Sequence, residues 1–515
     1  MSMLKFIAVV CLLHYTAPPA PGETVPPTFA PPAPPTSMSA QAPPAFYNVR
    51  DYGATGDGKT LDNRSIDRAI RACAGDGGGT VWIPSGIYLC GSIHLASHVH
   101  LEIGAGAVLK GAPQDSAAYD PEEPFPGKAY QDGGHTYFHN SLIWGENLVD
   151  VSITGQGMID GGGLVSFDKE TGEGPIGKGD KAIALKSCSR VLIRDITIYH
   201  GGHFAILVTG CDLLTLDNLT IDTNRDGIDL DGCTNSMVSN CRINSPNDDA
   251  LCPKSSYALG RPVITENLSI VNCGVSGFKE GTLLDGTRVP AKAGWSCGRI
   301  KFGTESNGGF RNCVVSNCTF NHCNGLALEL VDGGVLENIS ISNITMTDVV
   351  HYPVYITLGT RNRGPEGTVT GRVRNVLISN LIATGIDSMS GIQITGVPGH
   401  PVEGIHLQNI VLEYKGGGTK AQGQRIFPEL DRGYPEPSLL GVNPAYGLFA
   451  RHFRDLELSH ITIRAEKEDF RPAIICLDGE GLRIDHCMMK EIPGVPLSRF
   501  TDVSGVVIES SPFKN

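Results

Sequence analysis

From about residue 190 onward, the chain repeats a short alternation of apolar and polar positions, apolar-x-apolar-x-Asn/Asp/His-apolar. An alternation with a period of two predicts β-strands, and β-branched residues are frequent in these segments. Asp195, Asn218 and Asn240 are 23 and 22 residues apart, a spacing typical of one coil of a repeat protein. The polar position of the pattern recurs at Asn317, Asn343, Asn380, Asn409, His460 and His486.

One such strand cannot bury its apolar face alone, so the coils must stack on each other. The sequence therefore predicts an all-β fold, a right-handed parallel β-helix. Asparagines at one interior point of each coil would form a hydrogen-bonded ladder. Glycine, at 64 of 515 residues, would turn the corners. At the front, Ile66, Ala69, Ile70 and Cys73 fall at i, i+3, i+4 and i+7, which predicts a short helix that caps the open end of the core.

The first 45 residues have a composition unlike that of the rest. Lys5 and the apolar run Phe6 to Leu13 are typical of a secretory signal peptide, which we place at residues 1–22. Residues 23–45 belong to a proline-rich, nearly uncharged stretch and are predicted to be an extended linker. We expect a single β-helix domain over residues 46–515 and a secreted or periplasmic location.

The cysteines do not have the spacing of a metal site. Fourteen remain besides Cys11, and no Cys-x-x-Cys pair occurs among them. We expect small buried side chains in the core rather than a disulfide framework, although one or two bridges remain open for an exported protein.

The formal net charge is −13 and no long basic run occurs, which argues against a nucleic-acid partner. We expect no membrane span, no cofactor and a monomer.

Two acidic clusters carry the candidate chemistry. Asp226 and Asp248 are 22 residues apart, so they should lie on adjacent coils about 4.8 Å apart, with Asp249 in the same patch. Crowded carboxylates raise one another's pKa and can place an acid beside a base. An inverting glycosidase would need carboxyl groups about 6.5–9.5 Å apart. Turn residues or a calcium site are the alternatives.

These clusters also resemble a known family. Asn224 to Asp229, and Asn247-Asp248-Asp249 with Lys254-Ser255, resemble the Asn-Thr-Asp and Gly-Asp-Asp motifs of glycoside hydrolase family 28, the polygalacturonases. Phe302 to Gly309 is similar to a segment of its bacterial exo-acting members, and Tyr47 to Ala54 to the opening segment of pectin-degrading β-helix enzymes.

The resemblance implies hydrolysis of a pectic polysaccharide with inversion and without a metal ion. Asp248 would be the general acid, and Asp226 and Asp249 would polarise the attacking water. The candidate substrate-binding residues are Asn224, Asp229, Lys254, Arg299, Lys301 and Glu329.

Two departures from the family pattern bear on the substrate. The family's Gly-His-Gly is replaced by Ser296-Cys297-Gly298, and its uronate-binding Arg-Ile-Lys by Ala327-Leu328-Glu329. Losing a charge-assisted hydrogen bond costs about 1.5–3 kcal/mol, so plain homogalacturonan is disfavoured as substrate. Arg299 and Lys301 share one strand face and are candidates to replace the lost charge; an exposed, solvated pair is the alternative.

Other candidates are less specific. Trp295 and Tyr257 are candidate sugar-stacking aromatics, with a core or lid role as the alternative. His200 and His203 lie at the end of a predicted strand and are either catalytic or loop-stabilising. A polysaccharide lyase and a non-catalytic glycan-binding β-helix remain as alternative functions.

Overall fold

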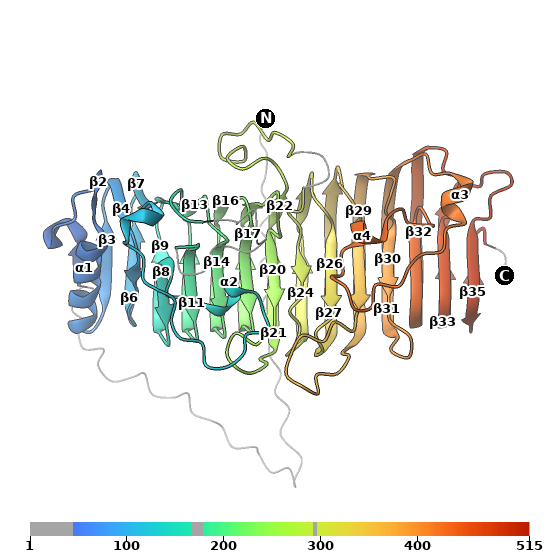
Figure 1. The fold of residues 1–515 in the computed structure, drawn as a ribbon. Coiled ribbons are helices and arrows are strands. Elements are labelled where there is room, and N and C mark those ends of the chain that lie inside the picture. The colour runs from blue at the N-terminus through green and yellow to red at the C-terminus, as the bar shows by residue number, and fades with distance from the viewer. Residues whose placement is uncertain (1–44, 166–178, 292–295, 514–515) are drawn as a thin grey trace, which may run out of the picture. The chain divides into compact units, whose positions relative to one another are not determined.

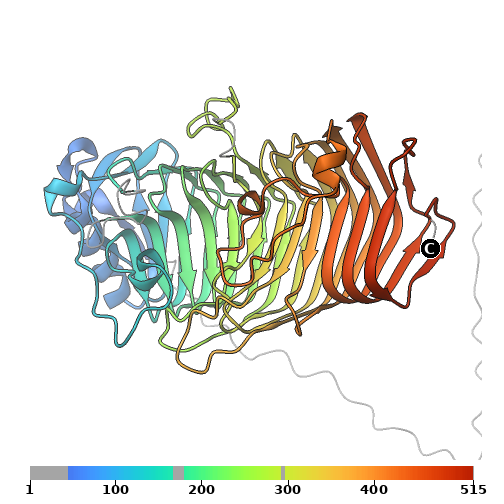
Figure 2. The ribbon, with the colours of Figure 1, turned by 45° about the vertical axis from the view of Figure 1, so that its right-hand side comes forward.

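Parallel strands pair coil upon coil from Phe46 to Glu509. The computed structural model describes residues 45–165, 179–291 and 296–513, which belong to a unit that runs from Pro44 to Asn515. Figures 1 and 2 show the strands stacked in chain order, from blue to red. The predicted right-handed parallel β-helix is confirmed. The predicted signal peptide and all of the linker except its last residue lie outside the described residues.

The described residues of this unit form two sheets and six short helices. The six-stranded sheet contains β5 (Ile93–His94), β8 (Ser141–Glu146), β11 (Lys181–Lys186), β14 (Phe204–Thr209), β17 (Asp226–Asp231) and β20 (Leu251–Lys254). The helices are η1 (Val49–Tyr52), α1 (Asn63–Gly75), η2 (Gln114–Ser116), α2 (Gly133–Thr136), α3 (Lys420–Gly423) and α4 (Pro437–Leu440).

The remaining strands form one continuous sheet. They are β1 (Phe46–Asn48), β2 (Asp57–Leu61), β3 (Gly79–Ile83), β4 (Gly86–Cys90), β6 (Val99–Ile103), β7 (Ala107–Gly111), β9 (Val149–Thr154), β10 (Met158–Asp160), β12 (Ser189–Arg194), β13 (Thr197–Tyr199), β15 (Asp212–Asp217), β16 (Thr220–Asp222), β18 (Thr234–Ser239), β19 (Arg242–Asn244), β21 (Thr265–Val271), β22 (Gly274–Ser276), β23 (Lys301–Phe302), β24 (Phe310–Ser316), β25 (Thr319–Asn321), β26 (Leu326–Leu330), β27 (Val335–Thr347), β28 (Val354–Leu358), β29 (Arg372–Ile386), β30 (Ile392–Thr395), β31 (Val402–Gly416), β32 (Leu448–Lys467), β33 (Ile474–Asp485), β34 (Met488–Met489), β35 (Ser498–Ser504) and β36 (Val507–Glu509).

The helix predicted at the front is confirmed as α1. Its residues Ile66, Ala69, Ile70 and Cys73 are buried in the main core, and the helix contacts β1, β3 and β5 at the first coils (Figure 1). The cysteines also behave as predicted: among the described residues none forms a disulfide, and all but Cys297 are buried. No helix in the described ranges is long and apolar enough to cross a membrane.

The asparagine ladder exists, but it lies outside the core rather than inside it. Asn272, Asn317, Asn343, Asn380 and Asn409 each donate a side-chain hydrogen bond to the asparagine of the preceding coil, over 2.7–3.3 Å, at exposed positions. All have a φ of 54–57°, in the left-handed region. Asparagine tolerates that conformation, which breaks the strand alternation and turns the side chain outward. These corners are therefore made by asparagine, not by glycine.

Two long insertions cover parts of the surface of the β-helix. Residues 112–140 join β7 to β8 and include α2; their Phe138 packs on Phe204 and Leu207 of β14. Residues 417–447 join β31 to β32 and include α4; their Phe427 packs on Phe449 and Ile475. Both insertions reach the region of the acidic clusters, which lie at the start of β17 and just before β20: His135 of the first contacts Asp229, and Glu436 of the second contacts Arg299.

Candidate active site

Asp226, Asp248 and Asp249 come together as the coil spacing predicted. Asp226 begins β17, and the other two precede β20, which pairs with β17 in parallel register. One carboxylate oxygen of each residue can be chosen so that all three lie within 4.8 Å of one another. Asp226 and Asp249 are buried, whereas the side chain of Asp248 keeps 24% of its surface exposed. Asp248 is therefore the member most accessible to a substrate.

Three cations balance the three carboxylates. The Arg225 guanidinium donates to Asp248 at 2.6 Å, and the Arg299 Nε donates to Asp249 at 2.6 Å. The Lys301 ammonium lies 2.5 Å from the second oxygen of Asp249. Each carboxylate except Asp226 therefore has a close positive partner.

Burial and the neighbouring charges shift the pKa values of the two buried aspartates in opposite directions. Burial raises the pKa of Asp226 well above its usual value, and the neighbouring Asp248 and Asp229 carboxylates raise it further. Burial also acts to raise the pKa of Asp249, but Lys301 and Arg299 outweigh it and hold that pKa well below the usual value. The surroundings thus favour the protonated form of Asp226 and the ionised form of Asp249.

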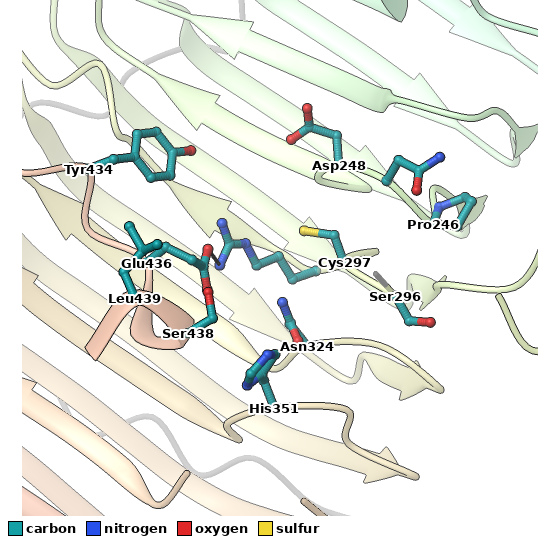
Figure 3. Close-up of a pocket in the computed structure, with 12 residues that line it drawn as sticks. Pro246, Asp248, Ser296, Cys297, Asn324, His351, Tyr434, Glu436, Ser438 and Leu439 are labelled. Atoms are coloured by element: carbon teal, nitrogen blue, oxygen red, sulfur yellow. Dashed lines mark hydrogen bonds and ion pairs between the residues drawn. The ribbon is translucent and has the colours of Figure 1, made fainter. Parts of the chain in front are cut away.

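A cavity of about 430 Å³ opens beside Asp248 (Figure 3). Asp248, Cys297 and Asn324 come from successive coils, while Tyr434 and Glu436 reach in from the 417–447 insertion. The Cys297 thiol lines the cavity and donates to Oδ1 of Asp249 at 3.4 Å. The site is therefore a pocket with carboxylates on one side and the insertion on the other.

Three of the candidate substrate-binding residues lie close to this cluster in the fold. Asn224 is partly buried and accepts a hydrogen bond from the side-chain amide of Asn247, which lines the cavity. Asp229 is fully buried on β17, and its pKa is raised well above the usual value by burial, which the Lys254 ammonium 3.7 Å away opposes. Lys254 also pairs with Glu305 at 3.2 Å. Contact of Asp229 and Lys254 with substrate stays a prediction.

Arg299 and Lys301 are not an exposed, solvated pair, so that alternative is wrong. Both are only 2% exposed: Lys301 begins β23 and Arg299 lies two residues before it, and both contact Asp249 and residues of the 417–447 insertion. Glu329 is fully buried with its Oε1 3.6 Å from Nη1 of Arg299. Burial raises the pKa of Glu329 to about 7, against the opposing effect of Arg299. Glu329 therefore lies behind the arginine and not on the pocket wall.

The two histidines have different environments. His203 is buried and stacks on Phe204, next to Arg225 and Asp132, and burial lowers its pKa well below the usual value. His200, in the loop after β13, is partly exposed, and its Nδ1 lies 2.8 Å from Oδ1 of Asp160, the last residue of β10. His203 thus belongs to the buried surroundings of the site, and His200 has the loop contact.

The candidate aromatic residues lie away from the cavity or cannot be placed. Tyr257 is partly buried and makes an edge contact with Tyr130 of the 112–140 insertion. Trp295 lies outside the described residues.

The three aspartates are also close enough to bind a metal ion. However, the ammonium and two guanidinium groups already bring three positive charges within 2.6 Å of them. A divalent ion would add charge to a balanced cluster and would have to displace these partners. The donor set fits acid–base chemistry better than metal binding.

Sequence patterns gave no signal for several neighbours of the site. His135, on α2, lies 3.4 Å from Asp229, and Tyr434 and Glu436 contact Lys301 and Arg299. These residues come from insertions without the coil pattern, so no periodicity relates them to the strands. Arg225 could have been found, since it stands between the motif residues Asn224 and Asp226.

Comparisons with known proteins find similar sequences and similar structures. The model of "Glycosyl hydrolases family 28" matches residues 90–427. A "Probable polygalacturonase" of Vitis vinifera is 25% identical over 381 residues, which cover 70% of this chain and 73% of the relative.

Two solved structures share the fold. An exopolygalacturonase of Thermotoga maritima has a TM-score of 0.59 at 23% identity, over 73% of this chain and 88% of that one. A family 28 exopolygalacturonase of Yersinia enterocolitica has a TM-score of 0.60 at 18% identity, over 90% and 78%.

Proposed function

The chain belongs to family 28 of the glycosyl hydrolases and is therefore a glycoside hydrolase; on that premise we propose that it hydrolyses a pectic polysaccharide at the Asp226–Asp248–Asp249 cluster. The observation that carries the proposal is the meeting of these three carboxylates at the wall of a cavity. Relatives named as polygalacturonases support a pectic substrate. A galacturonan or a rhamnogalacturonan type of chain fits this proposal.

Asp248 would protonate the leaving oxygen, because its side chain is the accessible one and faces the cavity. Asp226 and Asp249 would polarise a water for attack from the other side of the bond. The gap of up to 4.8 Å between carboxylate oxygens is spanned by one water that forms two hydrogen bonds of about 2.8 Å. This gap is shorter than the 6.5–9.5 Å separation usual for inverting pairs, so support for inversion comes from the family motifs.

The proton on Asp226 is part of this proposal. Carboxylates this close titrate together, so the proton belongs to the group and not to one residue. A substrate that enters beside Asp248 can draw the shared proton toward that side, which leaves Asp226 free to accept one from water. The buried, paired Asp249 stays ionised throughout.

Secretion to the periplasm or beyond, and action as a monomer, complete the proposal. A polymeric plant substrate lies outside the cell, and the apolar run Phe6 to Leu13 is the feature that supports export. Light scattering and N-terminal sequencing of the exported protein test these two points.

Digestion of rhamnogalacturonan and homogalacturonan in parallel tests the function. New reducing ends without ultraviolet absorbance would support hydrolysis, whereas absorbance from unsaturated ends would show a lyase. Binding of the polymers without products would show a non-catalytic protein. NMR of the first anomer released decides between inversion and retention.

A further inference from the structure

Arg299 is the one lysine or arginine among the described residues that line the cavity beside Asp248. Its Nε donates to Asp249 at 2.6 Å, and its Nη1 donates to Oε2 of Glu436 at 3.1 Å and to the Tyr352 hydroxyl. Only 3% of its side chain is exposed. The cation that would have to bind a uronate carboxylate in this pocket is therefore already paired.

Glu436 comes from outside the part of the chain that the family model matches. It precedes α4 in the 417–447 insertion, whereas the match ends at residue 427. The insertion is anchored on both sides of Glu436, because Phe427 and Leu440 pack in one apolar cluster with Phe449. Arg451 also donates to the carbonyl of Phe427 at 2.9 Å. The carboxylate is thus held in the pocket by a packed segment.

The Glu436 carboxylate takes the place of an acidic ligand. It forms with Arg299 the kind of charge-assisted hydrogen bond that a uronate carboxylate would form. A uronate that entered would have to displace it or remain without a cationic partner next to two carboxylates, those of Glu436 and Asp248.

Other polar groups of the pocket match a neutral sugar. Asn324, His351 and Ser296 line the cavity, and Oδ1, Nδ1 and Oγ of these side chains are buried and accept or donate no hydrogen bond among the described residues. Asn324 is 93% buried, and a buried carbonyl oxygen is normally hydrogen-bonded, so this side chain has unused capacity for a polar ligand in the adjoining cavity. Sugar hydroxyls donate and accept hydrogen bonds and would satisfy these groups and the Glu436 carboxylate together.

We propose that Glu436 determines specificity: its carboxylate occupies Arg299 and so selects a neutral sugar unit over a uronate in the pocket beside Asp248. The proposal rests on the proposed function for its chemistry, since it names which residue of a pectic chain this pocket takes. A chain that alternates neutral and acidic units fits, and a continuous polyuronate does not.

Glu436→Gln tests the proposal, with Glu429→Gln as the matched control. Glu429 lies in the same insertion but contacts Arg451 and His452, away from the cavity. In wild type and in the control, kcat/KM on rhamnogalacturonan oligosaccharides should exceed that on oligogalacturonides. In Glu436→Gln, Arg299 loses one ionic partner, and the ratio of the two kcat/KM values should shift at least tenfold in favour of the oligogalacturonide. An unchanged ratio, or an equal loss on both substrates, would overturn the proposal.

Calorimetry separates this proposal from the proposed function. Galacturonate should bind Glu436→Gln about tenfold more tightly than wild type at low salt, while rhamnose should not gain affinity. This measurement needs no catalysis, so it can succeed even if wild type hydrolyses neither polymer, in which case only the proposed function fails. If Glu436→Gln folds poorly, Glu436→Asp replaces it, because the shorter side chain withdraws the carboxylate from Arg299. This variant should shift the kcat/KM ratio and the galacturonate affinity in the same direction as Glu436→Gln. The absence of both shifts in Glu436→Asp would count against the proposal.

Discussion

Arg225 and Asp248, on neighbouring coils, are joined by a hydrogen bond of 2.6 Å between Nη2 and Oδ2. The side chain of Arg225 is 16% exposed and that of Asp248 24%. The Asp249 backbone N–H donates to the other oxygen, Oδ1, at 3.1 Å, so the carboxylate is held from both sides and has a fixed orientation beside the cavity.

Arg225→Gln is expected to lower kcat. The loss of a charge-assisted hydrogen bond, about 1.5–3 kcal/mol, corresponds to about a ten- to hundredfold decrease if the pair orients the reacting carboxyl. Because the change affects the reacting group and not the remainder of the pocket, KM should change less than kcat. Steady-state kinetics measures both. A change confined to KM would show that Arg225 binds substrate instead.

Asp226→Asn, Asp248→Asn and Asp249→Asn should each abolish most of the hydrolysis. General acid–base catalysis is worth about 10²–10⁴-fold, and losses in that range are expected for each change. Asp502→Asn is the control, since Asp502 is exposed and has a φ of 54° that asparagine tolerates. Circular dichroism should show intact folding in all four variants. Full activity of Asp248→Asn would refute its role as the acid.

Substitutions at Asn317 test whether the left-handed backbone conformation is what asparagine provides in the outer ladder. Asn317→Gly and Asn317→Ala lose the same side-chain hydrogen bonds, but alanine is strained at the φ of 55° and glycine is not. The strain costs the alanine variant about 1–2 kcal/mol, whereas the glycine variant loses some stability because glycine has more conformational entropy in the unfolded chain. The alanine variant should therefore be about 1 kcal/mol less stable than the glycine variant. Urea unfolding measures the difference.

The same pair of changes at Ser316 provides the control. Ser316 ends the extended strand β24 and is not in the left-handed region, so there the glycine variant should be the less stable one. The same order at both positions would show that the left-handed corner is not what asparagine provides.

His203 should make stability depend on pH. Burial lowers the pKa of this imidazole in the folded protein, so below the unfolded value of about 6.5 the unfolded chain binds a proton that the folded one does not. Its contribution to the free energy of unfolding is therefore complete above pH 6.5 and decreases as the pH falls.

Between pH 7 and pH 5 wild type should lose up to about 2 kcal/mol more than His203→Gln, as measured by urea unfolding at each pH. His400→Gln, at an exposed position, is the control and should follow wild type. Parallel curves for wild type and His203→Gln would show that His203 takes up its proton in the folded state.

The coil spacing predicted the fold and the position of the acidic cluster, because each coil stacks in register on the coil before it. Residues one repeat apart must lie on adjacent strands, so Asp226 and Asp248 could be brought together from their numbers alone. The helix at the front followed for a similar reason, since the spacing of Ile66 and Ala69 is that of one helical face.

The direction of the ladder could not be predicted in that way. Strand alternation places a residue inward or outward only while the backbone stays extended. The left-handed φ of Asn317 and its equivalents interrupts that alternation, and the side chains turn to the surface.

The sequence by itself determined the stack of coils and the meeting of three carboxylates, since both follow from a constant repeat length. Only the tertiary structure decided which cation pairs with each carboxylate and which residues line the pocket. Arg299 pairs with Glu436, 137 positions further along the chain, through an insertion that has no repeat. No periodicity relates such a segment to the strands beneath it, and its place is set by the packing of Phe427 and Leu440.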